Sequence, residues 1–365
     1  MKNTMLFCAL GACLFLTSCK NDEDEILEYT VPTTYIFDNV EYKESAARIS
    51  MWLGYTTYLG RSTRKVLSQD TVNYLWNNSN AAYTADMANN IPYPHTEINK
   101  LTFNLASKSA DVSTFKAYAD SMVAVSKFYN RPGAKGIAGK IGSRLFNYTG
   151  LEFNQAVAKG LMGGLSLYNI NAILDKIPSD DNKTVITGQG TAMQHNWDLA
   201  FGYVGIPANY DTTTAYTSAM PDRPLALGSY FAERGKYLKS GGIVFEAFRK
   251  GRAAIVAKDY KTRDAAIATI KEYLEKTMAA SAYYYMLTPQ TQSALDAKFH
   301  SLSEGYGFII ALKYRDASSK LTAANYQTLL DIIKTNFYTL AEDPSNTKLK
   351  QAQTILTEAY GKLQL

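Results

Sequence analysis

Apolar residues recur at steps of three and four along most of this 365-residue chain, which is the period of an amphipathic helix. The pattern predicts helices from Glu44 onward, over 111–129, over 150–174, over 264–285, over 323–340 and over 347–363. The alternation of a half-buried strand is nearly absent. Because the connections between these helices are short, the pattern predicts an all-α fold with antiparallel packing.

One long irregular connection interrupts the helical pattern near the middle of the chain. Pro207, Pro221 and Pro224 exclude a regular helix between residues 205 and 228. We therefore expect one all-α body over 29–365, with two helical halves at about 29–204 and 229–365. A connection of this length is often functional, so we expect it to form the rim or lid of a site.

The N-terminus predicts export followed by lipid attachment. Lys2 and the apolar run after it have the pattern of a secretory signal peptide over 1–18, and the run is too short to span a membrane. It ends in small residues before Cys19, as in a bacterial lipobox, so Cys19 is the expected lipidation site. The acidic tether over 19–28 resembles the surface-export signal of Bacteroidetes lipoproteins. We expect an outer-membrane lipoprotein exposed at the cell surface.

Composition narrows the classes of partner and site. The net charge is +5 and no block of basic residues occurs, so the sequence has no nucleic-acid footprint. All three cysteines lie in the first nineteen residues, so the body holds no disulfide and no cysteine metal site. The 27 tyrosines indicate ring packing between helices, or alternatively a surface that faces a carbohydrate or another ligand.

The most polar candidate site lies on a predicted helix that follows two glycines near the middle of the chain. His195 and Asp198 are three residues apart, so their side chains share a helix face. An imidazole and a carboxylate in this arrangement can bind a metal ion or act as an acid–base pair. The alternative is a structural hydrogen bond between the two.

A second histidine and two further carboxylates extend this hypothesis. His300 and Glu304 are one helical turn apart, and Glu152 lies on a predicted helix whose glycines indicate a closely packed neighbour. We treat His195, Asp198, Glu152, His300 and Glu304 as candidate ligands for iron or another divalent metal. The alternatives are a salt-bridged Glu152 and a simple pair between His300 and Glu304. Neither histidine belongs to a His-Glu-x-x-His motif.

Four blocks of the sequence together resemble the domain of unknown function 4856 family of Bacteroidetes lipoproteins. They are 150–152 with 159–163, 193–203, 247–255 and 300–308. The resemblance extends from about Tyr29 onward and implies a likeness to imelysin-like proteins, which are helical, are built of two bundle halves and carry a Gly-x-His-x-x-Glu motif linked to iron uptake. His195 and Asp198 correspond to the histidine and the acid of that motif. The chain departs from the motif in two ways: Met193 and Gln194 stand where the glycine should precede the histidine, and Asp198 replaces the glutamate.

The resemblance implies a lipoprotein that binds a metal or a metal-bearing ligand, as in iron uptake. The alternative is a non-catalytic interaction module that docks an outer-membrane receptor or a glycan. An imelysin-like peptidase is the third hypothesis. No nucleophile or zinc signature is visible, so the sequence favours a binding protein over an enzyme and assigns no catalytic residue.

Overall fold

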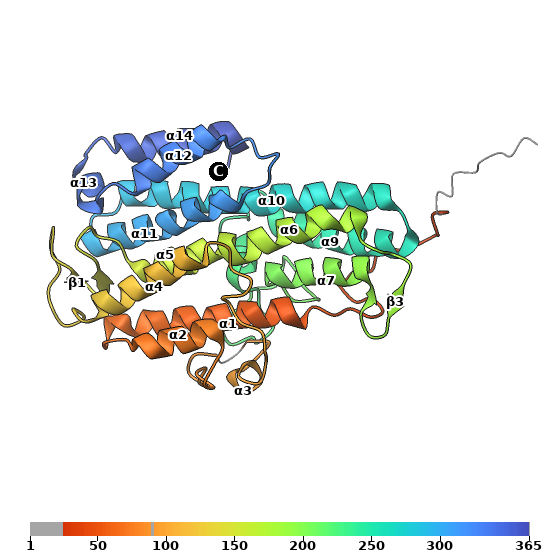
Figure 1. Cartoon of the computed structure of the whole chain (residues 1–365). Coiled ribbons are helices and arrows are strands. Elements are labelled where there is room, and N and C mark those ends of the chain that lie inside the picture. The colour runs from red at the N-terminus through yellow and green to blue at the C-terminus, as the bar shows by residue number, and fades with distance from the viewer. Residues whose placement is uncertain (1–24, 89–90, 365) are drawn as a thin grey trace, which may run out of the picture.

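The computed structural model describes residues 25–88 and 91–364, and most of them are helical (Figure 1). The helices α1 (Lys43–Gly60) and α2 (Gln69–Asn77) lie along one side, and α12 (Ala323–Ile333) and α14 (Thr347–Tyr360) along the opposite side. Between them lie α4 (Val112–Ser126), α5 (Phe153–Leu161), α6 (Tyr168–Lys176), α7 (Ala192–Val204), α9 (Ser240–Ala257), α10 (Tyr260–Leu287) and α11 (Leu295–Ala311). The predicted all-α class is confirmed.

The shorter elements connect these helices. They are the helices α3 (His95–Ile98), α8 (Tyr230–Glu233) and α13 (Phe337–Glu342) and several single turns of 3-10 helix. The helix predicted over 323–340 is in fact two, because the Asn336 side chain accepts a hydrogen bond from the backbone N–H of Tyr338 and caps a new helix. Two antiparallel hairpins complete the described residues: β1 (Gly139–Ile141) with β2 (Arg144–Phe146), and β3 (Val185–Ile186) with β4 (Gly190–Thr191).

The glycines after α5 bring three elements into direct contact. A π-helical segment, Met162–Leu167, joins α5 to α6. A Cβ on Gly163 would lie 2.4 Å from the backbone of Ala311, and one on Gly164 would lie 2.3 Å from the ring of Phe115. The close neighbour that the sequence predicted is therefore real, and it consists of α11 on one side and α4 on the other.

A single apolar core joins the two halves of the chain. It contains Phe115 and Phe201 from the first half together with Phe248, Leu274 and Phe308 from the second. Helix α5 packs along α11, and α7 packs along both α1 and α9. No helix within 25–88 and 91–364 is long and apolar enough to cross a bilayer. The predicted signal peptide and Cys19 lie outside the described residues.

Candidate functional site

Helix α7 begins with a capping box and carries the first predicted pair. The side chain of Thr191 accepts the N–H of Gln194, and Gln194 accepts the N–H of Thr191 in return. On this helix Asp198 points into the core with 0% exposure. There its carboxylate accepts hydrogen bonds from Nε of Arg252 at 2.9 Å and from the hydroxyl of Tyr35 at 2.6 Å.

His195 does not join Asp198 in this arrangement. Its side chain is only half-buried, and its Nδ1 is buried without a hydrogen-bond partner in the described part of the chain. Burial raises the pKa of the Asp198 carboxyl, although Arg252 and Tyr35 both favour its charged form. The Asp198 carboxylate is thus occupied by a core ion pair, and the two residues do not form one ligand set. A metal at His195 stays a prediction.

The other three candidate ligands come together where α5 packs on α11. We name Glu152, Lys159, His300 and Glu304 the α5–α11 cluster. The imidazole Nδ1 of His300 lies 2.7 Å from Glu152 Oε2, and its Nε2 lies 3.7 Å from Glu304 Oε1. Glu152 immediately precedes α5, and its backbone N–H donates to Ser303 at 2.9 Å, which fixes the carboxylate against α11.

The cluster contains its own cation. The ammonium of Lys159 lies 3.1 Å from Glu304, and Arg144 lies 3.6 Å from Glu152 at the exposed side. Burial opposes ionisation of Glu304, but Lys159, His300 and a hydrogen bond with Tyr285 outweigh it and lower the pKa of this carboxyl. Glu304 is therefore a buried carboxylate that stays charged because its neighbours supply positive charge and hydrogen bonds.

These contacts determine how well the cluster suits a metal ion. Among residues 25–88 and 91–364, no group of three or more His, Cys, Asp or Glu side chains is arranged to hold one. Both ring nitrogens of His300 already face carboxylates, and Lys159 occupies the place of a cation beside Glu304. A metal ion at this cluster would have to displace Lys159 and turn the imidazole.

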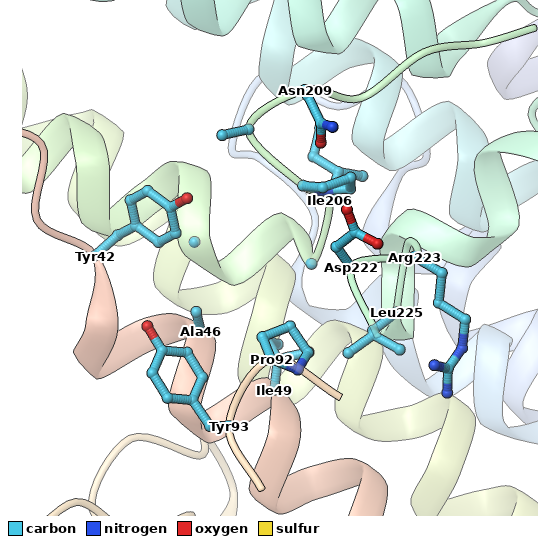
Figure 2. A pocket seen from close by; sticks show the side chains of 14 residues that line it. Tyr42, Ala46, Ile49, Pro92, Tyr93, Ile206, Asn209, Asp222, Arg223 and Leu225 are labelled. Atoms are coloured by element: carbon cyan, nitrogen blue, oxygen red, sulfur yellow. The ribbon is translucent and has the colours of Figure 1, made fainter. Parts of the chain in front are cut away.

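A cavity of about 230 Å³ lies between the start of α1 and the irregular connection that follows α7. Figure 2 shows the rings of Tyr42 and Tyr93 on one side of it and the side chains of Asn209 and Asp222 on the other. We name it the Tyr42–Tyr93 cavity. Its inner wall is apolar and its outer edge polar, because the inner wall includes buried Leu225 whereas Asn209 and Asp222 are exposed.

Gly202 of α7 and Gly205, which follows the helix, allow the close packing around this cavity. A Cβ on Gly202 would lie 2.1 Å from the hydroxyl of Ser45, so α1 can approach α7 only because this position is glycine. Gly205 has a φ of +78° and ends the helix in the left-handed region, which glycine adopts without strain. The chain then runs along the cavity at 205–209 and again at 222–225. The connection predicted as the rim of a site therefore does line a cavity.

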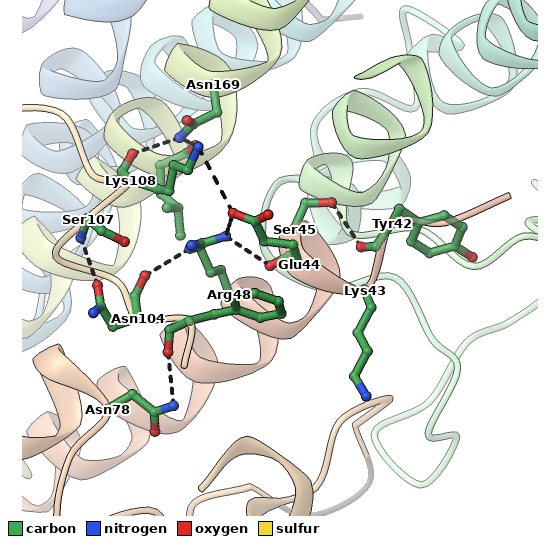
Figure 3. Close-up of polar contacts among 12 residues, drawn as sticks. Tyr42, Lys43, Glu44, Ser45, Arg48, Asn78, Asn104, Ser107, Lys108 and Asn169 are labelled. Carbon is green, nitrogen blue, oxygen red and sulfur yellow. Dashed lines mark hydrogen bonds and ion pairs between the residues drawn. The ribbon is translucent and has the colours of Figure 1, made fainter. Parts of the chain in front are cut away.

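A buried arginine holds the first turns of α1 in place beside the cavity. Arg48, 3% exposed, donates to Glu44 Oε1 at 2.6 Å and to the carbonyl oxygen of Asn104 at 2.9 Å (Figure 3). The same guanidinium lies 5.3 Å from the centre of the Phe103 ring. These contacts connect α1 to the segment before α4. They therefore stabilise the position of α1, which forms one wall of the cavity.

Sequence reasoning did not identify the residues of this cavity. Tyr42, Tyr93 and Asp222 come from three segments that are far apart in the chain. The available signals were the proline-flanked Tyr93 and the irregular connection after α7, and neither one indicated the other. The predicted ligands, in contrast, lie in the core around Asp198 and in the α5–α11 cluster.

Comparison with known proteins identifies one family that matches this chain. Residues 32–361 match a family described as a domain of unknown function (DUF4856), which confirms the resemblance found in the sequence. No curated protein and no solved structure matches the chain. The likeness to imelysin-like proteins stays a prediction.

Proposed function

Because the chain belongs to this family, whose description states no activity, we propose a function from the geometry. The protein is a lipid-anchored, non-catalytic binding protein that takes up a small organic ligand in the Tyr42–Tyr93 cavity. The observation that carries this proposal is a concave space with an apolar inner wall and a few polar groups at one edge. This is the usual composition of a small-molecule site, in which apolar area provides affinity and the polar groups provide orientation.

Filling the cavity tests this proposal. Ala46 lines the cavity, so Ala46→Phe should place a ring inside it. Thr57→Phe is the matched control, because Thr57 lies on the same helix and is exposed to solvent. We expect ligand-observed NMR with a library of small ring compounds to detect binders of the wild type and of Thr57→Phe that are lost in Ala46→Phe. Equal binding by all three folded proteins, or no binder at all, contradicts the proposal.

The anchor is proposed from the sequence, in which a lipobox ends at Cys19 and an acidic tether follows. Wild-type cells grown with labelled palmitate should incorporate the label into the protein, and Cys19→Ser should abolish it. Protease added to intact cells should degrade the wild type if the body faces outward. A labelled Cys19→Ser protein contradicts the anchor, and complete protection from protease contradicts surface exposure.

Metal binding is the second candidate function. Its support is the meeting of three predicted ligands at the α5–α11 cluster, where a metal ion would have to displace Lys159 from Glu304. Three of the five predicted ligands meet there around the His300 imidazole, and histidine with carboxylates suits iron or zinc. Calorimetry with ferrous, ferric and zinc ions should then show binding that His300→Gln removes and that His195→Gln retains. Loss of metal binding in His195→Gln alone would place the metal site on α7. Unchanged binding in both variants would exclude both histidines as ligands.

A further inference from the structure

The Tyr42–Tyr93 cavity also has features that specify a class of ligand. We propose that it binds a neutral, polyhydroxylated ring, namely a single pyranose sugar residue. This inference rests on the proposed binding function and adds the chemistry of the ligand. Three properties of the cavity carry it: its size, the two tyrosine rings, and the balance of charge at its edge.

The size of the cavity suits a ligand of one ring. A volume of about 230 Å³ is several times the roughly 30 Å³ share of one water molecule, which is room for a six-membered ring with its substituents. Because Asn209 and Asp222 at the cavity edge are exposed to solvent, a longer glycan could place its terminal residue inside and leave the remainder in solvent.

The two tyrosines provide a preformed apolar wall. The Tyr42 ring is fixed by an edge contact with Phe201, at 5.4 Å between the ring centres. Burial, with a smaller effect of Tyr42, raises the pKa of Tyr93 to about 12, so its phenol is neutral at physiological pH. The C–H face of a pyranose packs on such rings, and preformed walls lower the entropy cost of binding.

The polar groups at the edge of the cavity favour a ligand that carries hydroxyl groups. Asn209 offers both a donor and an acceptor, and Asp222 offers carboxylate acceptors. A wholly apolar ring would cover these groups without replacing their hydrogen bonds to water, at a cost of about 1–3 kcal/mol for each group. The ring of hydroxyls around a pyranose replaces these bonds while its C–H face meets the tyrosines.

The charge at the cavity favours a neutral ligand over an ion. Asp222 and Arg223 are adjacent in sequence and line the same edge, so their opposite charges offset each other. Arg223 donates to the carbonyl oxygen of Met220 at 2.9 Å, which directs part of its guanidinium to the protein itself. A carboxylate ligand would be attracted by Arg223 and repelled by Asp222, and an ammonium ligand would meet the reverse. Neither sign of charge therefore gains a net attraction over an uncharged sugar.

Titration with simple probes tests the ligand class on the full mature protein. The sugar probes are the methyl glycosides of glucose, galactose, mannose and N-acetylglucosamine, and the other probes are cyclohexylmethanol, benzoate and benzyltrimethylammonium. We expect at least one glycoside to bind by calorimetry or saturation-transfer NMR, and the other probes to bind at least ten-fold more weakly. Tyr93→Ala should weaken the binding of that glycoside at least ten-fold. Tyr93→Phe should retain the binding, and Asp222→Asn should weaken it several-fold. Tyr148→Ala is the matched control, because Tyr148 is 60% exposed and does not line the cavity.

The outcomes separate this inference from the binding function on which it rests. Glycoside binding that depends on Tyr93 and Asp222 supports both. Binding of an apolar or charged ring that depends on Tyr93, without binding of any glycoside, overturns the sugar class and leaves the cavity as a binding site. Glycoside binding that is unchanged in every folded variant places the sugar elsewhere and overturns the inference. No binding by any probe contradicts the sugar class and the proposed function together.

Discussion

The Asp198 carboxylate lies 2.9 Å from Nε of Arg252 at a point where both side chains are completely buried. The pair links α7 to α9, and the Tyr35 hydroxyl connects the segment before α1 to the same carboxylate. Trp197, the neighbour of Asp198, donates its indole N–H to the carbonyl oxygen of Phe248 on α9. The stretch around Asp198, which was the most polar candidate site in the sequence, therefore connects α7, α9 and the segment before α1.

Replacing one partner of this ion pair should lower the free energy of unfolding more than replacing both partners. Arg252→Met leaves the buried Asp198 carboxylate without its cation, and we expect the free energy of unfolding to fall by about 3–5 kcal/mol. The double variant Asp198→Leu/Arg252→Met buries no charge and should be more stable than Arg252→Met alone. Urea unfolding followed by circular dichroism measures both. Tyr35→Phe removes one hydrogen bond to the carboxylate and leaves the ion pair, so it should lose less, about 1.5–3 kcal/mol. A double variant less stable than Arg252→Met would contradict this account.

The ion pair of the α5–α11 cluster should make stability depend on pH. The pKa of Glu304 is lower in the folded protein than its usual value of 4.5, so the pair stabilises the fold above about pH 4.5. This stabilisation is lost as the pH falls through the folded pKa. Lys159→Met should therefore lower the free energy of unfolding by about 3 kcal/mol at pH 7, and the difference from wild type should shrink in acid.

Lys276→Met provides the comparison for this prediction. Lys276 pairs with Glu272 one helical turn away, and Glu272 is largely exposed, so that pair should contribute less than about 0.5 kcal/mol. Urea titrations between pH 3 and pH 7 on the three proteins give the required curves. A loss in Lys159→Met that is the same at pH 3 and pH 7 would show that its stem packs on the cluster but its charge contributes nothing.

The contact between the π-helical segment and α11 should depend on the absence of a side chain at Gly163. Gly163→Ala would place a Cβ 2.4 Å from the Ala311 backbone, which cannot rotate away, so α11 must shift. We expect a loss of about 1–3 kcal/mol. Gly60→Ala is the matched control, because its Cβ would meet only Asn154 at an ordinary 3.6 Å. Thermal melts should show a lower midpoint for Gly163→Ala and an unchanged or slightly higher one for Gly60→Ala.

The sequence by itself determined the features that arise from local periodicity and from residue type. Apolar positions every three to four residues produced the helices, and prolines produced the connection over 205–228. The glycines after α5 correctly indicated close packing, since a residue without a side chain inside a helix is costly unless a neighbour needs the space. The break before α13 was missed because Asn336 forms its cap through a geometry that periodicity does not show.

Only the tertiary structure decided which polar groups meet. The spacing of His195 and Asp198 assigns them to one helix face, but the partner of Asp198 is 54 residues away on another helix. Glu152 and His300 are separated by 148 residues, and they meet because α5 packs along α11. The cavity joins residues around 42, 93 and 222 in the same way. Helical periodicity acts over a few residues, whereas a site depends on how apolar faces distant in the chain pack against one another, and that packing determined which side chains were brought together.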